Sequence, residues 1–102
     1  MNELAAVAVV VTCNNVAHIV DQCIESLVKQ DYPPDKFSIV AVNDGSTDNT
    51  KEYLEYFKTH PNYYFFNHVK NQGLSAARNT GIKNNKSEII CLYIIQITTK
   101  TR

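Results

Sequence analysis

Residues 42–50, with the sequence VNDGSTDNT, combine residue types that can bind a ligand. Asp44 follows a hydrophobic run, so a buried strand would deliver its carboxylate to the end of a sheet at a fixed height. A carboxylate in that position can accept hydrogen bonds from the imide and hydroxyl groups of a nucleoside. Gly45 permits a sharp turn, and one of residues 46–48 can cap the next helix. Because Asp44 precedes that cap, we expect its carboxylate to be surplus to the local structure and free for a ligand.

Two simpler interpretations of this stretch stay open at the level of the sequence. The residues could form only a turn and a helix N-cap, with no ligand. Alternatively, Asp44 and Asp48 could bind magnesium, although Asp48 is better explained as the start of a helix.

Helices and strands alternate along the chain around this stretch. Residues 5–12 (AAVAVVVT) are a continuous apolar run, typical of a central strand covered on both faces. From Asn14 or Asn15, which are good N-cap residues, an apolar stripe at helical spacing runs to Val28 and stops before the prolines at 33 and 34. The remaining elements are expected as strands at 37–43, 63–69 and 88–95 and as helices at 49–60 and 74–84.

Apolar side chains of the second and third helices are expected to face the core. In the second helix these residues are Tyr53, Leu54, Tyr56 and Phe57. In the third helix they are Leu74, Ala77 and Ile82, with Gly81 permitting close packing.

Strands separated by helices of this length pair in parallel through right-handed crossovers. The sequence therefore predicts an α/β fold, with an open, mainly parallel, Rossmann-like sheet and flanking helices in a single domain over residues 1–102. In such sheets the ligand crevice lies beyond the carboxyl ends of the strands. That rule selects three loops, at residues 12–15, 43–48 and 70–75.

Composition excludes several classes of protein. With 102 residues, 44% of them hydrophobic, the chain can form one domain with a core. Ten basic and ten acidic residues leave no net charge, so neither nucleic acid nor an anionic membrane is an expected partner. The three cysteines lack CxxC spacing and are interpreted as small buried hydrophobic residues rather than zinc ligands. The apolar runs are too short to span a bilayer and no targeting segment is evident, so we expect a cytoplasmic chain without a membrane segment.

Four segments together resemble the first half of a family 2 glycosyltransferase, over about residues 7–92. They are VAVVVTCNN, QDYPPDKF, IVAVNDGSTDNT and NQGLSAARNTGI, and they occur in the family's order and spacing. The resemblance implies a partial GT-A fold, and thus an incomplete domain. It also implies transfer of a sugar from a nucleotide-sugar, commonly UDP-linked, to a glycan, lipid or polymer acceptor.

The resemblance further implies a set of nucleotide-binding residues. Thr12 and Asn14 would flank the base, and Asp44 would hold the uracil imide. Residues of the third loop and the helix after it would lie beside the nucleotide and its diphosphate, namely Lys70, Asn71, Gly73, Arg78 and Asn79. The guanidinium fork of Arg78 suits phosphate oxygens, although a solvated helix charge or a salt bridge is the alternative for this residue.

The sequence departs from the family pattern at three places. Asn14 replaces a tyrosine that usually stacks on the base, and Asn43 replaces a usual aspartate. The family's DxD-type metal motif aligns with residues 94–96, which are two isoleucines and a glutamine. These side chains cannot hold magnesium. We therefore expect no metal and no catalytic residue in this chain alone, although the complete family enzyme should use magnesium or manganese.

Two hypotheses from different classes remain. The chain is either the donor-nucleotide half of a glycosyltransferase or a non-catalytic nucleotide-binding or regulatory module on the same scaffold. An NAD-binding domain is excluded, because the first strand-to-helix turn, TCNN, contains no glycine. His68 is the one histidine expected near the crevice, and we favour a structural role for it. The apolar residues 89–97 should form an exposed sheet edge, which predicts self-association.

Overall fold

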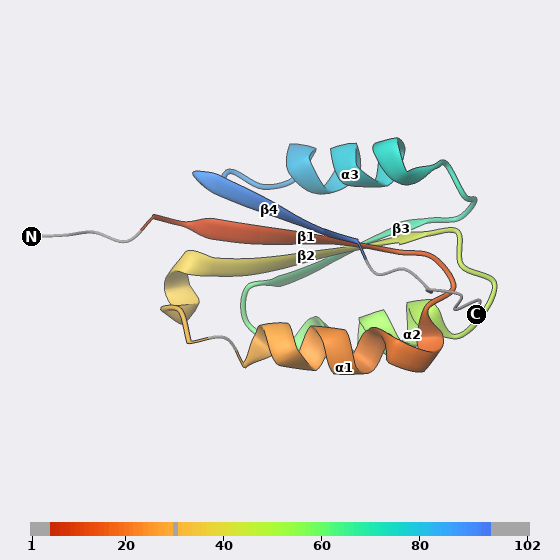
Figure 1. Ribbon diagram of the computed structural model, residues 1–102, viewed down its shortest axis with the longest axis horizontal. Helices are drawn as coiled ribbons and strands as arrows, with labels where there is room; N and C mark the ends of the chain where they lie inside the picture. Colours follow the sequence, from red (N-terminus) through yellow and green to blue (C-terminus); the bar gives the residue numbers. More distant parts are fainter. Residues whose placement is uncertain (1–4, 30, 95–102) are drawn as a thin grey trace, which may run out of the picture.

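The computed structural model of the chain describes residues 5–29 and 31–94. They form one parallel four-stranded sheet in the order β3-β2-β1-β4. Helices α1 and α2 cover one face of this sheet, and α3 covers the other (Figure 1). The strands are β1 (Val7–Cys13), β2 (Phe37–Asp44), β3 (Tyr63–His68) and β4 (Ile89–Ile94), and the helices are α1 (Ala17–Val28), α2 (Thr50–Tyr56) and α3 (Leu74–Lys83). Short 3₁₀ turns occupy Pro34–Lys36 and Phe57–Thr59. The predicted open parallel α/β sheet is confirmed, with boundaries within about two residues for most elements.

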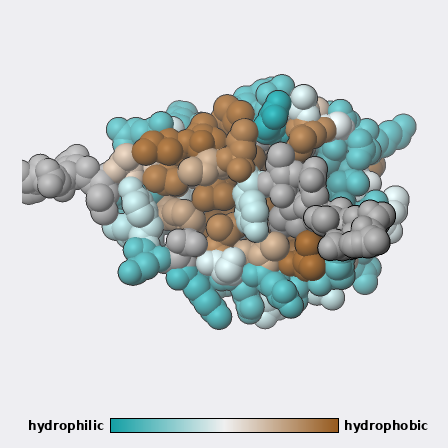
Figure 2. Space-filling view, viewed as in Figure 1, coloured by the Kyte–Doolittle hydropathy of each residue, from teal (hydrophilic) through white to brown (hydrophobic). Residues whose placement is uncertain are grey.

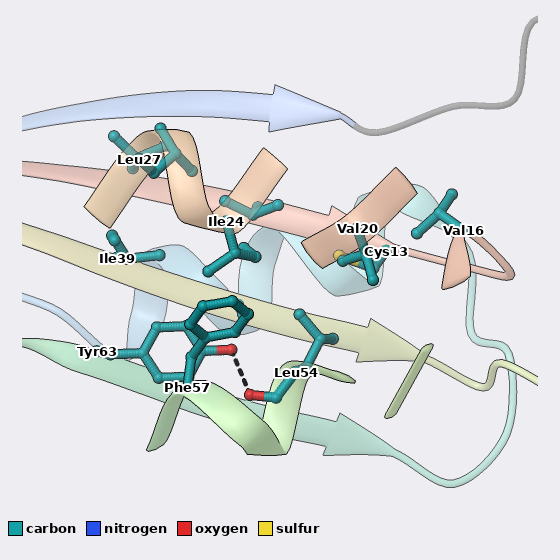
Figure 3. Close-up of a cluster of buried hydrophobic side chains, with 12 residues drawn as sticks. Cys13, Val16, Val20, Ile24, Leu27, Ile39, Leu54, Phe57 and Tyr63 are labelled. Atoms are coloured by element: carbon teal, nitrogen blue, oxygen red, sulfur yellow. Dashed lines mark hydrogen bonds between the residues drawn. The ribbon is translucent and has the colours of Figure 1, made fainter. Parts of the chain in front are cut away.

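Strands β1 and β2 are central because apolar residues occupy both of their faces. Alternate residues point to opposite sides of a strand, so one set packs under α1 and α2 and the other under α3. The larger cluster contains Val11, Ile24, Leu54 and Phe57, all of them buried (Figure 3). The smaller cluster joins Val10, Val40 and Val42 to Ala77 of α3. Among the described residues, no helix is long and apolar enough to cross a membrane.

The start of α1 differs from the prediction. Asn15 is not the N-cap, because its backbone is left-handed (φ 55°) and Val16 occupies the N-cap position without a side-chain cap of its own. The backbone N–H of Val16 instead donates to Oγ1 of Thr50, at 2.9 Å. The first turn of α1 is therefore capped from the start of α2, a contact between residues distant in sequence.

The inner face of α2 is narrower than predicted. Leu54 and Phe57 are buried, as expected. Tyr53 and Tyr56 are 40% and 76% exposed, so the prediction that they face the core is wrong. Leu54 lies in α2 and Phe57 in the 3₁₀ turn that follows it, and both pack inward while the tyrosines remain at the solvent side.

The inner face of α3 consists of small residues. Ala77 and Gly81 are buried, whereas Leu74 and Ile82 are 41% and 39% exposed, contrary to the prediction. A Cβ atom added to Gly81 would lie 2.3 Å from Cγ1 of Val10, so the predicted close packing at Gly81 is confirmed. The close approach of α3 to β1 leaves room only for small side chains, and the larger ones lie at the sides.

Strand β4 is an edge strand in the described sheet, since only β1 pairs with it. Ile89, Leu92 and Tyr93 are 46%, 46% and 39% exposed, and apolar residues gather over this strand (Figure 2). Cys91 is exposed on the same strand. The interpretation of the cysteines as buried residues is therefore confirmed for Cys13 and wrong for Cys91.

We expect Gly81→Ala to destabilise the fold by about 1–3 kcal/mol through overpacking against Val10. In an uncrowded helix the same change would stabilise the fold by about 0.5–1 kcal/mol. The sign of the change in the free energy of unfolding therefore tests whether Gly81 packs against Val10. Urea unfolding measures both this variant and the exposed control Lys83→Ala, which should shift stability by less than about 0.5 kcal/mol. A stabilised Gly81→Ala variant would contradict the packing described.

Self-association through β4 remains a prediction. If two copies pair along this edge, sedimentation velocity should show concentration-dependent dimers. Leu92→Lys places a charge on the exposed edge and should shift the equilibrium to monomers, whereas Lys83→Ala should not. A chain that stays monomeric at all concentrations would refute this prediction.

Candidate functional site

The carboxyl ends of β1, β2 and β3 meet at one edge of the sheet, which we call the rim. Asp44 is the last residue of β2 and pairs in register with His68, the last residue of β3. Both residues are buried, with exposed fractions of 5% for Asp44 and 8% for His68. The predicted delivery of Asp44 to the rim by a buried strand is confirmed.

The Asp44 carboxylate accepts three hydrogen bonds that join separate segments. Its Oδ1 lies 2.9 Å from the backbone nitrogen of Gln72 and 3.0 Å from Nδ1 of His68. Its Oδ2 lies 3.0 Å from the backbone nitrogen of Gly73. Burial alone would raise the pKa of Asp44, but these donors outweigh it and hold the pKa below its usual value. The carboxylate therefore remains ionised inside the rim.

These bonds correct the expectation that Asp44 is surplus to the structure. Its carboxylate fastens the loop at residues 71–73 to the end of β2. Oδ1 has two donors, whereas Oδ2 has one and keeps capacity to accept another. Asp44 could still accept a hydrogen bond from a ligand, but only through Oδ2.

Gly45 is required where the chain leaves β2. Its φ of +68° is in the left-handed region, and an added Cβ would lie 2.2 Å from the backbone nitrogen of Asn71. Its own N–H donates to the carbonyl oxygen of His68, at 3.0 Å. No side chain can be accommodated between these two segments.

Asn14 and Asn71 meet at the same residue. The Nδ2 atoms of both side chains donate to the carbonyl oxygen of Asp44, at 2.7 Å and 3.3 Å. Together with Gly73, these two predicted site residues are therefore gathered around Asp44. The three loops predicted to form the crevice lie at one rim.

Asp48 lies just before Asn49, which rather than one of residues 46–48 is the N-cap residue of α2, and its side chain accepts hydrogen bonds from the starts of both α2 and α1. Its Oδ1 accepts the backbone N–H of Thr50 at 3.0 Å and the Thr50 hydroxyl at 2.6 Å, and its Oδ2 accepts the N–H of Ala17 at 3.2 Å. Burial opposes the shift, but these donors lower the pKa of Asp48. Nowhere in residues 5–29 and 31–94 do three or more His, Cys, Asp or Glu side chains cluster as metal ligands. Ile95 and Gln96, which align with part of the family's metal motif, lie outside the described residues.

Thr12 has a hydroxyl without a partner. It is 5% exposed near the end of β1, two residues after Val10, and so lies on the α3 face of the sheet. Within the described part of the chain its Oγ1 is buried and makes no hydrogen bond. Such an atom costs about 1–3 kcal/mol of stability, so it needs an explanation.

Lys70 and Arg78 are not drawn into this hydrogen-bond network. Lys70 is exposed beside Asn71, and Arg78 is half-buried in α3. In the described ranges the only ion pair within 4.0 Å joins His68 to Asp44, so a salt bridge for Arg78 is not found there. Asn79 is exposed on the same helix.

Gln72 and Thr80 were not predicted as residues of this site, whereas His68 was expected near the crevice in a structural role. Gln72 donates through its backbone N–H, and because almost every residue has one, the residue type could not predict this contact. His68 makes hydrogen bonds through both ring nitrogens, with Nε2 lying 2.8 Å from Oγ1 of Thr80, so the favoured structural role is confirmed. Its position at the end of a strand next to β2 was the available signal.

The sheet and its polar rim define a parallel α/β domain of the kind that binds ligands beyond the carboxyl ends of its strands. Residues 8–94 match the family model described as "Glycosyl transferase family 2". The chain belongs to this family. It is 34% identical over 88 residues to the glycosyltransferase AglE of Haloferax volcanii, covering 85% of this chain and 29% of that protein. It is 38% identical over 78 residues to the glycosyltransferase GlyA of Streptococcus pneumoniae, covering 76% and 11%.

Solved structures show the same likeness. One is TarS 1–349 of S. aureus in complex with UDP-GlcNAc, with a TM-score of 0.79 and 28% identity over 86% of this chain and 26% of that one. Another is the mannosyltransferase PcManGT of Pyrobaculum calidifontis in complex with GDP-Man and Mn²⁺, with a TM-score of 0.78, 29% identity and coverage of 84% and 26%. The GT-A fold is thereby shown, and the chain spans under a third of the length of these relatives.

Asp44→Asn should lower the free energy of unfolding by about 1–3 kcal/mol at pH 7, because an amide cannot accept all three donors. The folded-state pKa of Asp44 is depressed, so its stabilisation is present above the unfolded value of about 4 and is lost as the pH falls through the folded value. The difference between wild type and variant should therefore shrink below about pH 4. Urea unfolding at pH 7 and pH 3 measures it, and a pH-independent difference would show that the charge does not contribute.

Proposed function

We propose that this chain is the donor-nucleotide-binding part of a glycosyltransferase, an incomplete domain that takes a UDP-sugar for transfer to a glycan, lipid or polymer acceptor. Membership in glycosyl transferase family 2 supports the proposal, as do neighbours solved with UDP-GlcNAc and with GDP-Man. The three cysteines are free, which supports a reducing compartment such as the cytoplasm.

The single observation that carries the proposal is the unpaired hydroxyl of Thr12. Asp44, Asn14 and Asn71 are explained by the hydrogen bonds that hold the rim together. Thr12 is not, since its Oγ1 is buried at the rim end of β1 without a partner among the described residues. Because this oxygen has almost no exposed surface, a ligand group beside β1 would satisfy it once the side chains that cover it move aside.

The remaining rim residues have complementary chemistry. Oδ2 of Asp44 can accept the imide N–H of uracil. Gly73 has open space where a Cβ would be, so a ligand can approach its backbone there. Lys70 and Arg78 carry charges that suit a diphosphate, and in the described residues no carboxylate lies within ion-pair distance of either.

Turnover requires groups that we do not assign to this chain. A family member uses a metal ion to stabilise the leaving diphosphate, and PcManGT was solved with Mn²⁺. The described residues offer no cluster for such an ion. We therefore propose nucleotide binding without sugar transfer by this chain alone.

A nucleotide-binding or regulatory module without chemistry is the second candidate, and the same lack of a metal cluster among the described residues favours it. The gene sequence after codon 102 distinguishes the two. A DxD-type motif followed by a further α/β segment there would identify the donor half of an enzyme, and other sequence would favour the module.

Thr12→Val should weaken UDP binding by about 2- to 12-fold, the loss of one hydrogen bond of about 0.5–1.5 kcal/mol. The same change should leave the free chain as stable as before or more stable, because it removes a buried hydroxyl without a partner. Titration calorimetry with UDP and urea unfolding measure the two effects. A variant that binds UDP more weakly but is no less stable shows that the hydroxyl serves binding rather than the structure.

Thr12→Ser, which keeps the hydroxyl, is the matched control and should retain UDP affinity within about twofold. If wild type binds no UDP, or if Thr12→Val binds it as tightly as wild type, the hydroxyl does not serve a nucleotide and the proposal fails.

A further inference from the structure

The geometry points to His68 as a positioning residue that selects Oδ2 of Asp44 as the atom that reads the base. The inference rests on the proposed function, since it concerns the same rim. It adds a residue that the family pattern did not suggest and assigns it a role in discriminating between bases.

His68 is held at both ends of its ring. Nδ1 lies 3.0 Å from Oδ1 of Asp44, and Nε2 lies 2.8 Å from Oγ1 of Thr80 on α3. The ring is buried at the end of β3, and the backbone carbonyl oxygen of His68 accepts the N–H of Gly45. One residue thus connects the ends of β2 and β3 to the middle of α3.

The hydrogen bonds determine where the ring carries its proton. Asp44 is ionised, so Nδ1 must carry the hydrogen that it donates to Oδ1. Nε2 of a neutral ring then accepts the hydroxyl hydrogen of Thr80.

The two carboxylate oxygens of Asp44 differ in how many hydrogen-bond donors they already have. Oδ1 is occupied by His68 and by the N–H of Gln72. Oδ2 receives only the N–H of Gly73 and can accept one more donor. Without the ring, Oδ1 would have a vacant acceptor site, and only the N–H groups of Gln72 and Gly73 would restrict the terminal torsion of the carboxylate, which is a soft one.

A base read by a fixed acceptor must present an N–H. Uracil offers N3–H, whereas a uracil methylated at N3 offers none and would place a methyl group against Oδ2. A site built around a buried acceptor rejects a ligand that lacks the matching donor, since the acceptor is then left unpaired. The ratio of affinities for UDP and N3-methyl-UDP therefore reports directly on Asp44.

The test compares this ratio among variants of the whole 102-residue chain by titration calorimetry. Wild type should prefer UDP over N3-methyl-UDP by at least about tenfold. His68→Leu should lower this ratio by at least about threefold, because the carboxylate is then held only by the backbone amides of Gln72 and Gly73 and Oδ1 has a vacant acceptor site. The neighbouring Val69→Ala, at an 86% exposed position, is the matched control and should keep the wild-type ratio.

Two amide variants keep the test decisive if His68→Leu does not fold. His68→Asn carries an N–H near the position of Nδ1 and should keep most of the preference. His68→Gln reaches toward Thr80 instead and should lose it. A purely structural role predicts that both amides weaken UDP and N3-methyl-UDP by the same factor.

The outcomes separate the two proposals. If wild type binds UDP but does not prefer it over N3-methyl-UDP, Asp44 does not read the base and the inference fails with that part of the proposed function. If wild type discriminates and the histidine variants discriminate equally well, the proposed function stands and the role of His68 is overturned.

Discussion

The buried carboxylate of Asp44 is the interaction on which the rim depends. An ionised group inside a protein is tolerated only when hydrogen bonds replace its lost water, and here two backbone amides and His68 do so. Gly73 is also the N-cap residue of α3, so the carboxylate lies at the positive end of that helix. One charge therefore joins the ends of two strands to the start of a helix, and removing it would leave several donors unpaired at once.

A second constraint fixes the far part of α3. Gly81 lets the helix approach Val10 of β1, and Ala77 continues the same small-residue face. Between these contacts and the Asp44 carboxylate, α3 is held against the sheet at two places along its length. Arg78 lies on the same helix, so its distance from the rim is set by packing against the sheet rather than by a contact of its own.

The sequence predicted the sheet well because its signals are local. Continuous apolar runs identified β1 and β2, and prolines and glycines marked the turns. Two of the wrong predictions concern the cap of α1 and the buried face of α3, which depend on contacts with residues distant in sequence. Asn15 is a sound N-cap residue in isolation, but Thr50 supplies the contact. Leu74 is apolar and was expected inside, but the close approach of α3 admits only small residues there.

The site residues were harder to predict than the fold, because the same motif at residues 42–50 can hold a loop in place or bind a ligand. The carboxylate of Asp44 was predicted to be free for a ligand, yet it holds the loop at residues 71–73, whereas Gly45 forms the predicted sharp turn. Their presence therefore does not by itself argue for a nucleotide. Thr12 was placed in a crevice loop by its position at the end of a strand and beside the base by the resemblance, and its hydroxyl is the one described buried side-chain polar atom without a hydrogen bond. The hydrogen bonds of the fold do not explain this hydroxyl, which supports the proposed ligand at this rim more than the motif beside it does.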